Sequence, residues 1–262
     1  MLFAGEMNGL LIFIFGLIIG SFLNVLILRL PENQSISGFS RCHNCKKRIA
    51  WYDNIPVFSF LFLRGHCRNC GSKISWQYPI IELLTAFLFL LSFLVYKSNS
   101  VFLIYILFLV SFLIVVAILD LKHFIILDNS ILLGFMVSFI FIFLAPDFLL
   151  LVSRFYGLLF FAGIFLVLFL FSRGQWIGFG DVKLAALLGF VFGLESSIVI
   201  FYLAFLAGFI IAIILLVLKK ADLKTQIPLG SLMSAAGIFF LLSGFNLLEL
   251  INADLILRIW SR

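Results

Sequence analysis

Residues 101–120 read VFLIYILFLVSFLIVVAILD, a run whose only charged residue, Asp120, comes at its end. About 20 apolar residues in an α-helix suffice to cross the hydrocarbon core of a bilayer. Similar apolar runs lie on both sides, and together they cover 8–28, 80–96, 101–119, 124–145, 149–171, 183–197, 198–218 and 232–252. We therefore predict an all-α polytopic membrane protein with about eight transmembrane helices.

The composition agrees with a membrane protein. Of 262 residues, 64% are hydrophobic and 11% are charged. A soluble domain carries about 25% charged residues, so the soluble globular class is excluded. The formal net charge of +6 does not indicate nucleic acid, because basic residues of a polytopic protein collect in its cytoplasmic loops. The runs 183–197 and 198–218 fit either two spans or one long or re-entrant element.

The basic residues also predict the orientation. Most of the 18 lysines and arginines fall in or beside the segments 30–79, 120–123, 172–182 and 219–231. The exceptions are Lys97, Arg154, Arg258 and Arg262. The positive-inside rule then places the four segments in the cytoplasm and both termini outside.

The one sizeable hydrophilic segment, 31–79, holds every cysteine of the chain. They form two Cys-x-x-Cys pairs, Cys42, Cys45, Cys67 and Cys70. This spacing is close to that of a four-thiolate zinc site, where each two-residue gap lets one tight turn present two sulfurs to the ion. Disulfides are the alternative, but they are rare in the reducing cytoplasm. Four thiolates close the zinc shell without His43 or His66, so we predict a structural ion rather than a catalytic one.

Two carboxylates lie at the membrane boundary on the predicted cytoplasmic side. Asp120 ends SFLIVVAILD, and Asp181 ends WIGFGD and opens the next helix. If they meet, one could activate a water as general base while the other protonates the substrate as general acid. Gly178 and Gly180 lack a Cβ and would admit a substrate backbone or a partner helix near Asp181. The residue types alone also fit interfacial or helix-capping aspartates, as we expect for Asp128.

Six strings together carry a family resemblance. They are GSFLNVLILRLP at 20–31, the two Cys-x-x-Cys pairs, DNIPVFSFLFLRG at 53–65, ISWQYPIIE at 74–82, ILD at 118–120 and GFGDVKLAALLG at 178–189. They resemble the bacterial type IV prepilin peptidases, polytopic aspartic peptidases of the G-x-G-D class, over essentially the whole chain. The late string IPLGS at 227–231 preserves half of the family's IPFGP-like pattern.

The resemblance implies that Asp120 and Asp181 are the catalytic pair of an aspartic endopeptidase. Such an enzyme cleaves the basic leader of type IV prepilins or pseudopilins at the cytoplasmic face, just after a glycine. For many members it also implies N-methylation of the new N-terminus by S-adenosylmethionine, although no glycine-rich Rossmann fingerprint is present. The alternatives are a peptidase without methyl transfer, and a zinc-anchored transporter or scaffold whose aspartates bind a proton or cation.

These expectations divide the chain into three parts. They are a first transmembrane helix at 1–30, a cytoplasmic zinc-binding module at 31–79 and a seven-helix aspartic peptidase membrane domain at 80–262. We expect a multi-pass protein of the bacterial cytoplasmic membrane with its active site facing the cytoplasm. Its partners would be prepilin and pseudopilin substrates and the lipid bilayer, with no nucleic acid. The expected cofactors are structural Zn²⁺ and S-adenosylmethionine, and the sequence assigns no residues to the latter.

Overall fold

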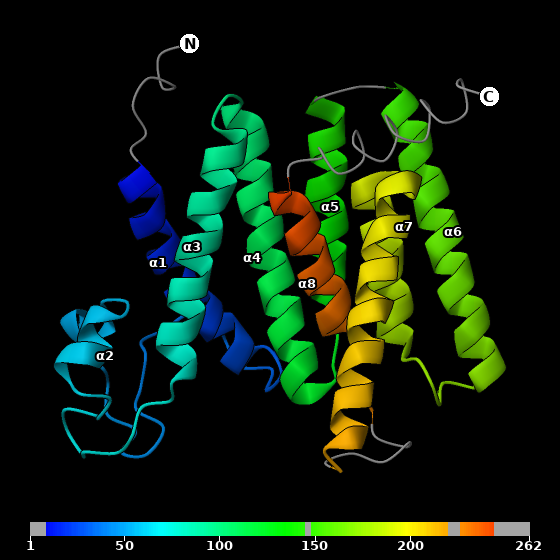
Figure 1. Cartoon of the computed structure of the whole chain (residues 1–262). Coiled ribbons are helices and arrows are strands. Elements are labelled where there is room, and N and C mark those ends of the chain that lie inside the picture. Colours follow the sequence, from blue (N-terminus) through cyan, green and yellow to red (C-terminus); the bar gives the residue numbers. More distant parts are fainter. Residues whose placement is uncertain (1–8, 145–147, 220–225, 244–262) are drawn as a thin grey trace, which may run out of the picture. The chain divides into compact units, whose positions relative to one another are not determined.

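The computed structural model describes residues 9–144, 148–219 and 226–243, and these ranges are helical apart from connecting segments and two isolated β-bridges (Figure 1). The all-α prediction is therefore confirmed. The elements are α1 (Gly9–Arg29), the 3-10 helix η1 (Trp51–Asn54), α2 (Phe58–Phe62), α3 (Gln77–Tyr96), α4 (Ser100–His123), α5 (Asp128–Leu144), α6 (Phe148–Ser172), α7 (Phe179–Val217) and α8 (Leu229–Leu242).

The chain divides into two compact units, Met1–Ser111 and Phe112–Arg262. The first contains α1, η1, α2 and α3, and the second contains α5 to α8. The boundary between the units falls inside α4. The parts expected at 1–30, 31–79 and 80–262 stay a prediction.

In the first unit, α1 and α3 approach each other closely because α1 presents glycines to α3. A Cβ on Gly16 would lie 2.6 Å from the Ala86 Cα, and a Cβ on Gly20 would lie 2.7 Å from the Glu82 Cα. Small residues permit this close packing of apolar helices. One turn further along α1, the buried Asn24 amide donates a hydrogen bond to the Tyr78 carbonyl oxygen, 3.2 Å away. A side chain of α1 is thus hydrogen-bonded to the backbone in the first turn of α3.

Five of the described helices are long and apolar enough to cross a membrane. They are Gly9–Arg29, Gln77–Tyr96, Ser100–His123, Leu151–Ser172 and Phe179–Val217. Two shorter apolar helices, Asp128–Ile142 and Leu229–Leu242, accompany them. The predicted count of eight spans is not confirmed, and the predicted span 232–252 lies partly outside the described residues.

The chain reverses within α7, at Gly193. This residue has φ 78° and ψ 175°, a conformation that a side chain would strain. The Ser197 hydroxyl donates to the Leu188 carbonyl oxygen at 3.3 Å. Residues nine positions apart in a straight helix would be about 13.5 Å apart along the axis, so this bond requires the helix to fold back. Of the two arrangements left open for 183–218, the structure has two helical segments, and they join at Gly193 rather than after residue 197.

The predicted span 124–145 begins four residues too early. After α4 ends at His123, the backbone turns at Phe124, which has φ 54°, and α5 starts only at Asp128. The apolar residues 124–127 therefore form a connection, although their composition alone continues the hydrophobic run. This connection carries Ile126 to the site described next.

Candidate functional site

Asp120 lies in the last turn of α4 and is only 5% exposed. Its Oδ2 accepts a hydrogen bond of 2.6 Å from the backbone N–H of Ser231, and the backbone N–H of Gly230 also interacts with the carboxylate. Both N–H groups belong to the first turn of α8. The first N–H groups of a helix lack partners within the helix, and the helix dipole favours negative charge there. Asp120 is thus held at the N-terminus of a different helix.

Asp181 lies at the N-terminus of its own helix, α7. Its Oδ2 accepts a hydrogen bond of 3.0 Å from the backbone N–H of Gly178, which is the N-cap residue. This is one half of a capping box, and it fixes the carboxylate at the start of the helix. Asp181 is half-buried and interacts electrostatically with Asp120. The structure therefore brings the two predicted aspartates into one site within the second unit.

Ile126, from the connection between α4 and α5, fills the space beside two glycines of this site. A Cβ on Gly180 would lie 3.0 Å from the Ile126 Cβ, and a Cβ on Gly230 would lie 2.9 Å from the Ile126 Cδ1. The Cβ on Gly230 would also lie 3.0 Å from the Asp120 Oδ2. Gly180 thus admits a neighbouring side chain of this protein, and Gly230 admits the carboxylate itself.

Gly230 and Ser231 were not among the residues predicted for the site. The sequence feature that could have indicated them is the string IPLGS at 227–231, which preserves half of the family's IPFGP-like pattern. These residues lie more than 100 positions after Asp120 in the chain, so neither composition nor motif spacing predicts the contact.

Asp128, the first residue of α5, forms an ion pair with Lys183 of α7, with Nζ and Oδ1 2.5 Å apart. The Lys183 ammonium also lies 4.8 Å from the centre of the Phe179 ring. These contacts connect the starts of α5 and α7 near the two aspartates. Asp128 therefore has a structural partner of its own, in addition to its expected place at a helix start.

The four cysteines come together in the first unit. Their sulfur atoms all lie within 4.8 Å of one another, and the thiols of Cys42 and Cys70 are 3.8 Å apart. All four are free, and a disulfide would require about 2.05 Å. Four sulfurs at 2.3 Å from a tetrahedral zinc would be about 3.8 Å apart, so the cluster fits this ion. Among the described residues, the cluster contains neither His43 nor His66.

Each cysteine pair lies in the same kind of turn. The Cys42 N–H donates to the Lys47 carbonyl and the Lys46 N–H to the Cys42 carbonyl, both at 3.0 Å. Twenty-five residues later, the Cys67 N–H donates to the Ser72 carbonyl at 2.8 Å, and the Gly71 N–H to the Cys67 carbonyl at 2.9 Å. The bridges Arg41–Arg48 and His66–Lys73 close the two turns. We call residues 41–48 and 66–73 the two knuckles.

The thiols of the knuckles differ in pKa. The backbone N–H of Cys45, pointing at the Cys42 sulfur, lowers the pKa of Cys42 to about 6. The Ser72 hydroxyl and N–H lower the pKa of Cys70. At Cys45 the Lys47 N–H also acts to lower the pKa, but desolvation and the neighbouring thiolates raise it to about 11. Crowded thiolates repel one another, and a bound cation would relieve that repulsion.

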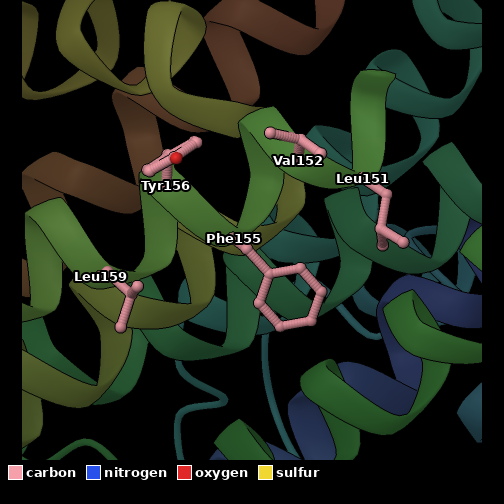
Figure 2. A pocket seen from close by; sticks show the side chains of 5 residues that line it. All are labelled: Leu151, Val152, Phe155, Tyr156 and Leu159. Atoms are coloured by element: carbon pink, nitrogen blue, oxygen red, sulfur yellow. The ribbon is translucent and has the colours of Figure 1, made fainter. Parts of the chain in front are cut away.

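A hollow also lies along α6. Figure 2 shows its lining side chains, Leu151, Val152, Phe155, Tyr156 and Leu159, all on that one helix. Most are exposed and all but Tyr156 are hydrocarbon, as expected for a surface facing lipid. The hollow contains no acid or base suited to peptide hydrolysis, so we do not assign it to the active site.

The fold and site define a class: an all-helical membrane protein with two interacting carboxylates at helix N-termini and a separate four-thiol cluster. A family model described as "Bacterial Peptidase A24 N-terminal domain" matches residues 14–96, and one described as "Type IV leader peptidase family" matches residues 107–213. The chain belongs to the type IV leader peptidase family. No solved structure matches it.

Curated relatives agree with this assignment. The chain is 33% identical over 245 residues to the "Prepilin leader peptidase/N-methyltransferase" of Bacillus subtilis, covering 91% of this chain and 96% of the relative. It is 30% identical over 264 residues to the protein of that name from Pseudomonas aeruginosa, covering 87% and 88%. A relative from Myxococcus xanthus is 51% identical over 86 residues, which are 32% of this chain and 26% of that protein.

Proposed function

We propose that this chain is an aspartic endopeptidase that uses Asp120 and Asp181 as its acid–base pair. The proposal is supported by the electrostatic interaction between Asp120 and Asp181, each of which accepts a backbone N–H hydrogen bond at a helix N-terminus. Family membership supplies the reaction class, peptide hydrolysis. An Asp120 side chain only 5% exposed would be costly to maintain at a membrane boundary without a functional reason.

The pair can divide the chemistry of hydrolysis. One carboxylate takes a proton from a water molecule as the water oxygen bonds to the scissile carbonyl carbon. The other, initially protonated, donates its proton to the carbonyl oxygen. The tetrahedral intermediate then collapses, the C–N bond breaks, and the leaving amine receives a proton from the pair. Two carboxylates in one site share protons in this way because both do not readily ionise together.

The proposed substrates are prepilins and pseudopilins, whose basic leader would be removed at the cytoplasmic face of the bacterial inner membrane. The names of the relatives support the substrate class. The distribution of lysines and arginines supports the orientation. Because Asp120 and Asp181 lie at ends of apolar helices, a substrate helix could stay in the bilayer while its leader reaches the site.

The four cysteines Cys42, Cys45, Cys67 and Cys70 would hold Zn²⁺. The closed shell leaves no position for a water, so the ion would supply folding stability rather than catalysis. The segment around it offers few buried apolar side chains, and a bound metal can replace a hydrophobic core.

A second proposed activity is N-methylation of the new N-terminus, and the word "N-methyltransferase" in the names of the relatives supports it. S-adenosylmethionine would supply the methyl group, and the residues that bind it stay unassigned. We expect these residues to be distinct from the aspartate pair, because methyl transfer to an amine needs no activated water.

The test is cleavage of a purified pilin precursor by the detergent-solubilised enzyme, followed by mass spectrometry. Asp120→Asn and Asp181→Asn should each reduce cleavage by about 10²–10⁴-fold. Asp128→Asn is the matched control, because it removes a nearby ion-paired carboxylate and should retain most of the activity. Cleavage that persists in either Asn variant of the pair would overturn the assignment.

The same assay separates the two activities. With an already cleaved substrate, the Asn variants of the pair should still add one methyl group when S-adenosylmethionine is supplied. A wild-type enzyme that cleaves but never methylates would instead be a peptidase alone.

A further inference from the structure

The segment 55–63, with sequence IPVFSFLFL, belongs to neither the knuckles nor the spanning helices. It is too short to cross a bilayer, and apolar stretches of this size are typical of interfacial segments. Its side chains are largely outside the core of the first unit: Phe58 is 68% exposed, Leu61 64% and Phe62 82%. A group of large apolar side chains exposed together marks a contact surface.

The depth of this segment follows from its connection to α3. The backbone N–H of Val57, at the start of α2, donates to the Glu82 Oε2 at 2.7 Å. Glu82 is the sixth residue of α3, so it lies about 7.5 Å along the helix from Gln77. Figure 1 accordingly shows α2 beside the lower part of α3 rather than beyond its end. If α3 spans the bilayer, the start of α2 lies at the level of the membrane interface.

One side chain fixes which face of α2 turns outward. Phe60 is 9% exposed, and its ring lies 4.8 Å from that of Trp76, just before α3. Phe58, Leu61 and Phe62 are left on the opposite side. The packing of Phe60 therefore orients the exposed apolar group away from the protein.

The backbone of the segment is suited to a poorly hydrated environment. The N–H groups of Ser59, Leu61 and Leu63 donate to the carbonyls of Ile55, Val57 and Ser59, at 2.9–3.1 Å. The Ser59 hydroxyl donates to the Ile55 carbonyl at 2.7 Å. Satisfied polar groups can enter the membrane interface at low cost, whereas unsatisfied ones cannot.

The basic residues before and after the segment favour lipid over a basic substrate leader as the partner of this surface. Exposed basic side chains lie on both sides of the segment in the sequence, Arg64 directly after it and Lys46, Lys47 and Arg48 seven to nine residues before it. The acidic residue nearest in the sequence, Asp53, is ion-paired with Arg68. Anionic headgroups attract such residues, and aromatic side chains favour the headgroup level. A basic substrate leader would be repelled by the same side chains.

We propose that residues 55–63 form a membrane-interface anchor, in which Phe58, Leu61 and Phe62 insert into a leaflet containing anionic phospholipid. The anchor would hold the knuckles against the membrane surface, because Gly65 joins it directly to the second knuckle. The proposal concerns only the first unit and does not depend on the assignment of the aspartate pair.

The test uses the full-length protein with the photo-crosslinker p-benzoylphenylalanine at Phe62, reconstituted in vesicles of phosphatidylethanolamine and phosphatidylglycerol. The matched control carries the crosslinker at Asn69, an exposed residue in the second knuckle. Circular dichroism during heating establishes that both labelled proteins are folded. We expect several-fold more phospholipid adduct, detected by mass spectrometry, at position 62 than at position 69.

Other outcomes would overturn the proposal. Equal lipid adducts at both positions would mean that the segment has no special contact with the membrane. A crosslinked dimer at position 62 would show a second copy on this surface, and an adduct with an added pilin precursor would show a substrate contact. The absence of any lipid adduct at position 62 would exclude insertion.

Discussion

The thiol cluster and the aspartate site are built in opposite ways. The cluster consists of two equivalent turns, 41–48 and 66–73, and each turn fixes its two cysteines through hydrogen bonds between residues a few positions apart. The aspartate site brings together Asp120, Asp181 and the Gly230–Ser231 backbone, which lie up to 111 residues apart in the chain. Local turns form one site, and the packing of three helices, α4, α7 and α8, forms the other.

The two sites therefore differ in which substitutions can damage them. A knuckle is set by its own short sequence, so damage to one should remain within the first unit. The aspartate site depends on the exact approach of α8 and α7 to the end of α4, so a change of one methyl group there can move a carboxylate. Substitutions that change zinc binding without changing cleavage, or the reverse, test this difference between the two sites.

The largest effect should come from removing either aspartate or both. If the two carboxylates act as the proposed catalytic unit, the double variant Asp120→Asn/Asp181→Asn should lose no more cleavage than either single variant, about 10²–10⁴-fold. Rate measurements on the three variants with one pilin precursor make the comparison. Losses that multiply in the double variant would mean that the two residues act independently.

If the four cysteines hold zinc as proposed, Cys67→Ser should abolish stoichiometric zinc and unfold the knuckles, because metal binding would supply their folding energy. Cleavage should fall far less than in the aspartate variants, since the second unit keeps its own site. Zinc per chain, measured by elemental mass spectrometry, and cleavage rate give the two readouts. His43→Ala is the control: it changes a neighbour of Cys42 that lies outside the cluster and should retain zinc. Zinc loss in that variant would make His43 a ligand.

Gly230→Ala should lower cleavage by about 10–100-fold, because its Cβ would lie 3.0 Å from the Asp120 Oδ2 and displace the carboxylate or the start of α8. Gly163→Ala is the matched control, since a Cβ at this helical glycine of α6 meets nothing within 4 Å. The cleavage rate and the midpoint of thermal unfolding are compared for both. Equal activity in the two variants would show that the close approach at Gly230 does not position Asp120.

The contrast between the sites also explains what the sequence could predict. Cys42, Cys45, Cys67 and Cys70 could be grouped in advance because their spacing is itself the geometry of a knuckle. The order of the apolar runs placed Asp120 and Asp181 on the same side of the membrane, and it placed Asp181 at the start of a helix. The hydrogen bond from Ser231 to Asp120 could not be predicted from the sequence. It depends on how α8 packs against the end of α4, and no local sequence pattern encodes that packing.

The helix boundaries show the same limit. The run 101–119 corresponds to α4 within a few residues, since its hydrophobicity ends at Asp120. The start predicted at 124 fails because apolar residues 124–127 are used to reach Gly180 and Gly230 through Ile126, not to continue a helix. The break predicted after 197 lies at Gly193, where one backbone conformation rather than composition ends the helical segment.

The smallest effect we predict tests whether the two knuckles are truly equivalent. The residue after the second cysteine is left-handed in both, with φ 57° at Lys46 and φ 68° at Gly71. A side chain in this conformation costs about 1 kcal/mol, so Lys46→Gly should tighten zinc binding about fivefold and Gly71→Ala should weaken it by a similar factor. Competition with a chelator measures both. If zinc affinity instead changed in the same direction in both variants, Lys46 would have a role beyond the turn. The two knuckles would then have the same backbone conformation but different contributions to zinc binding.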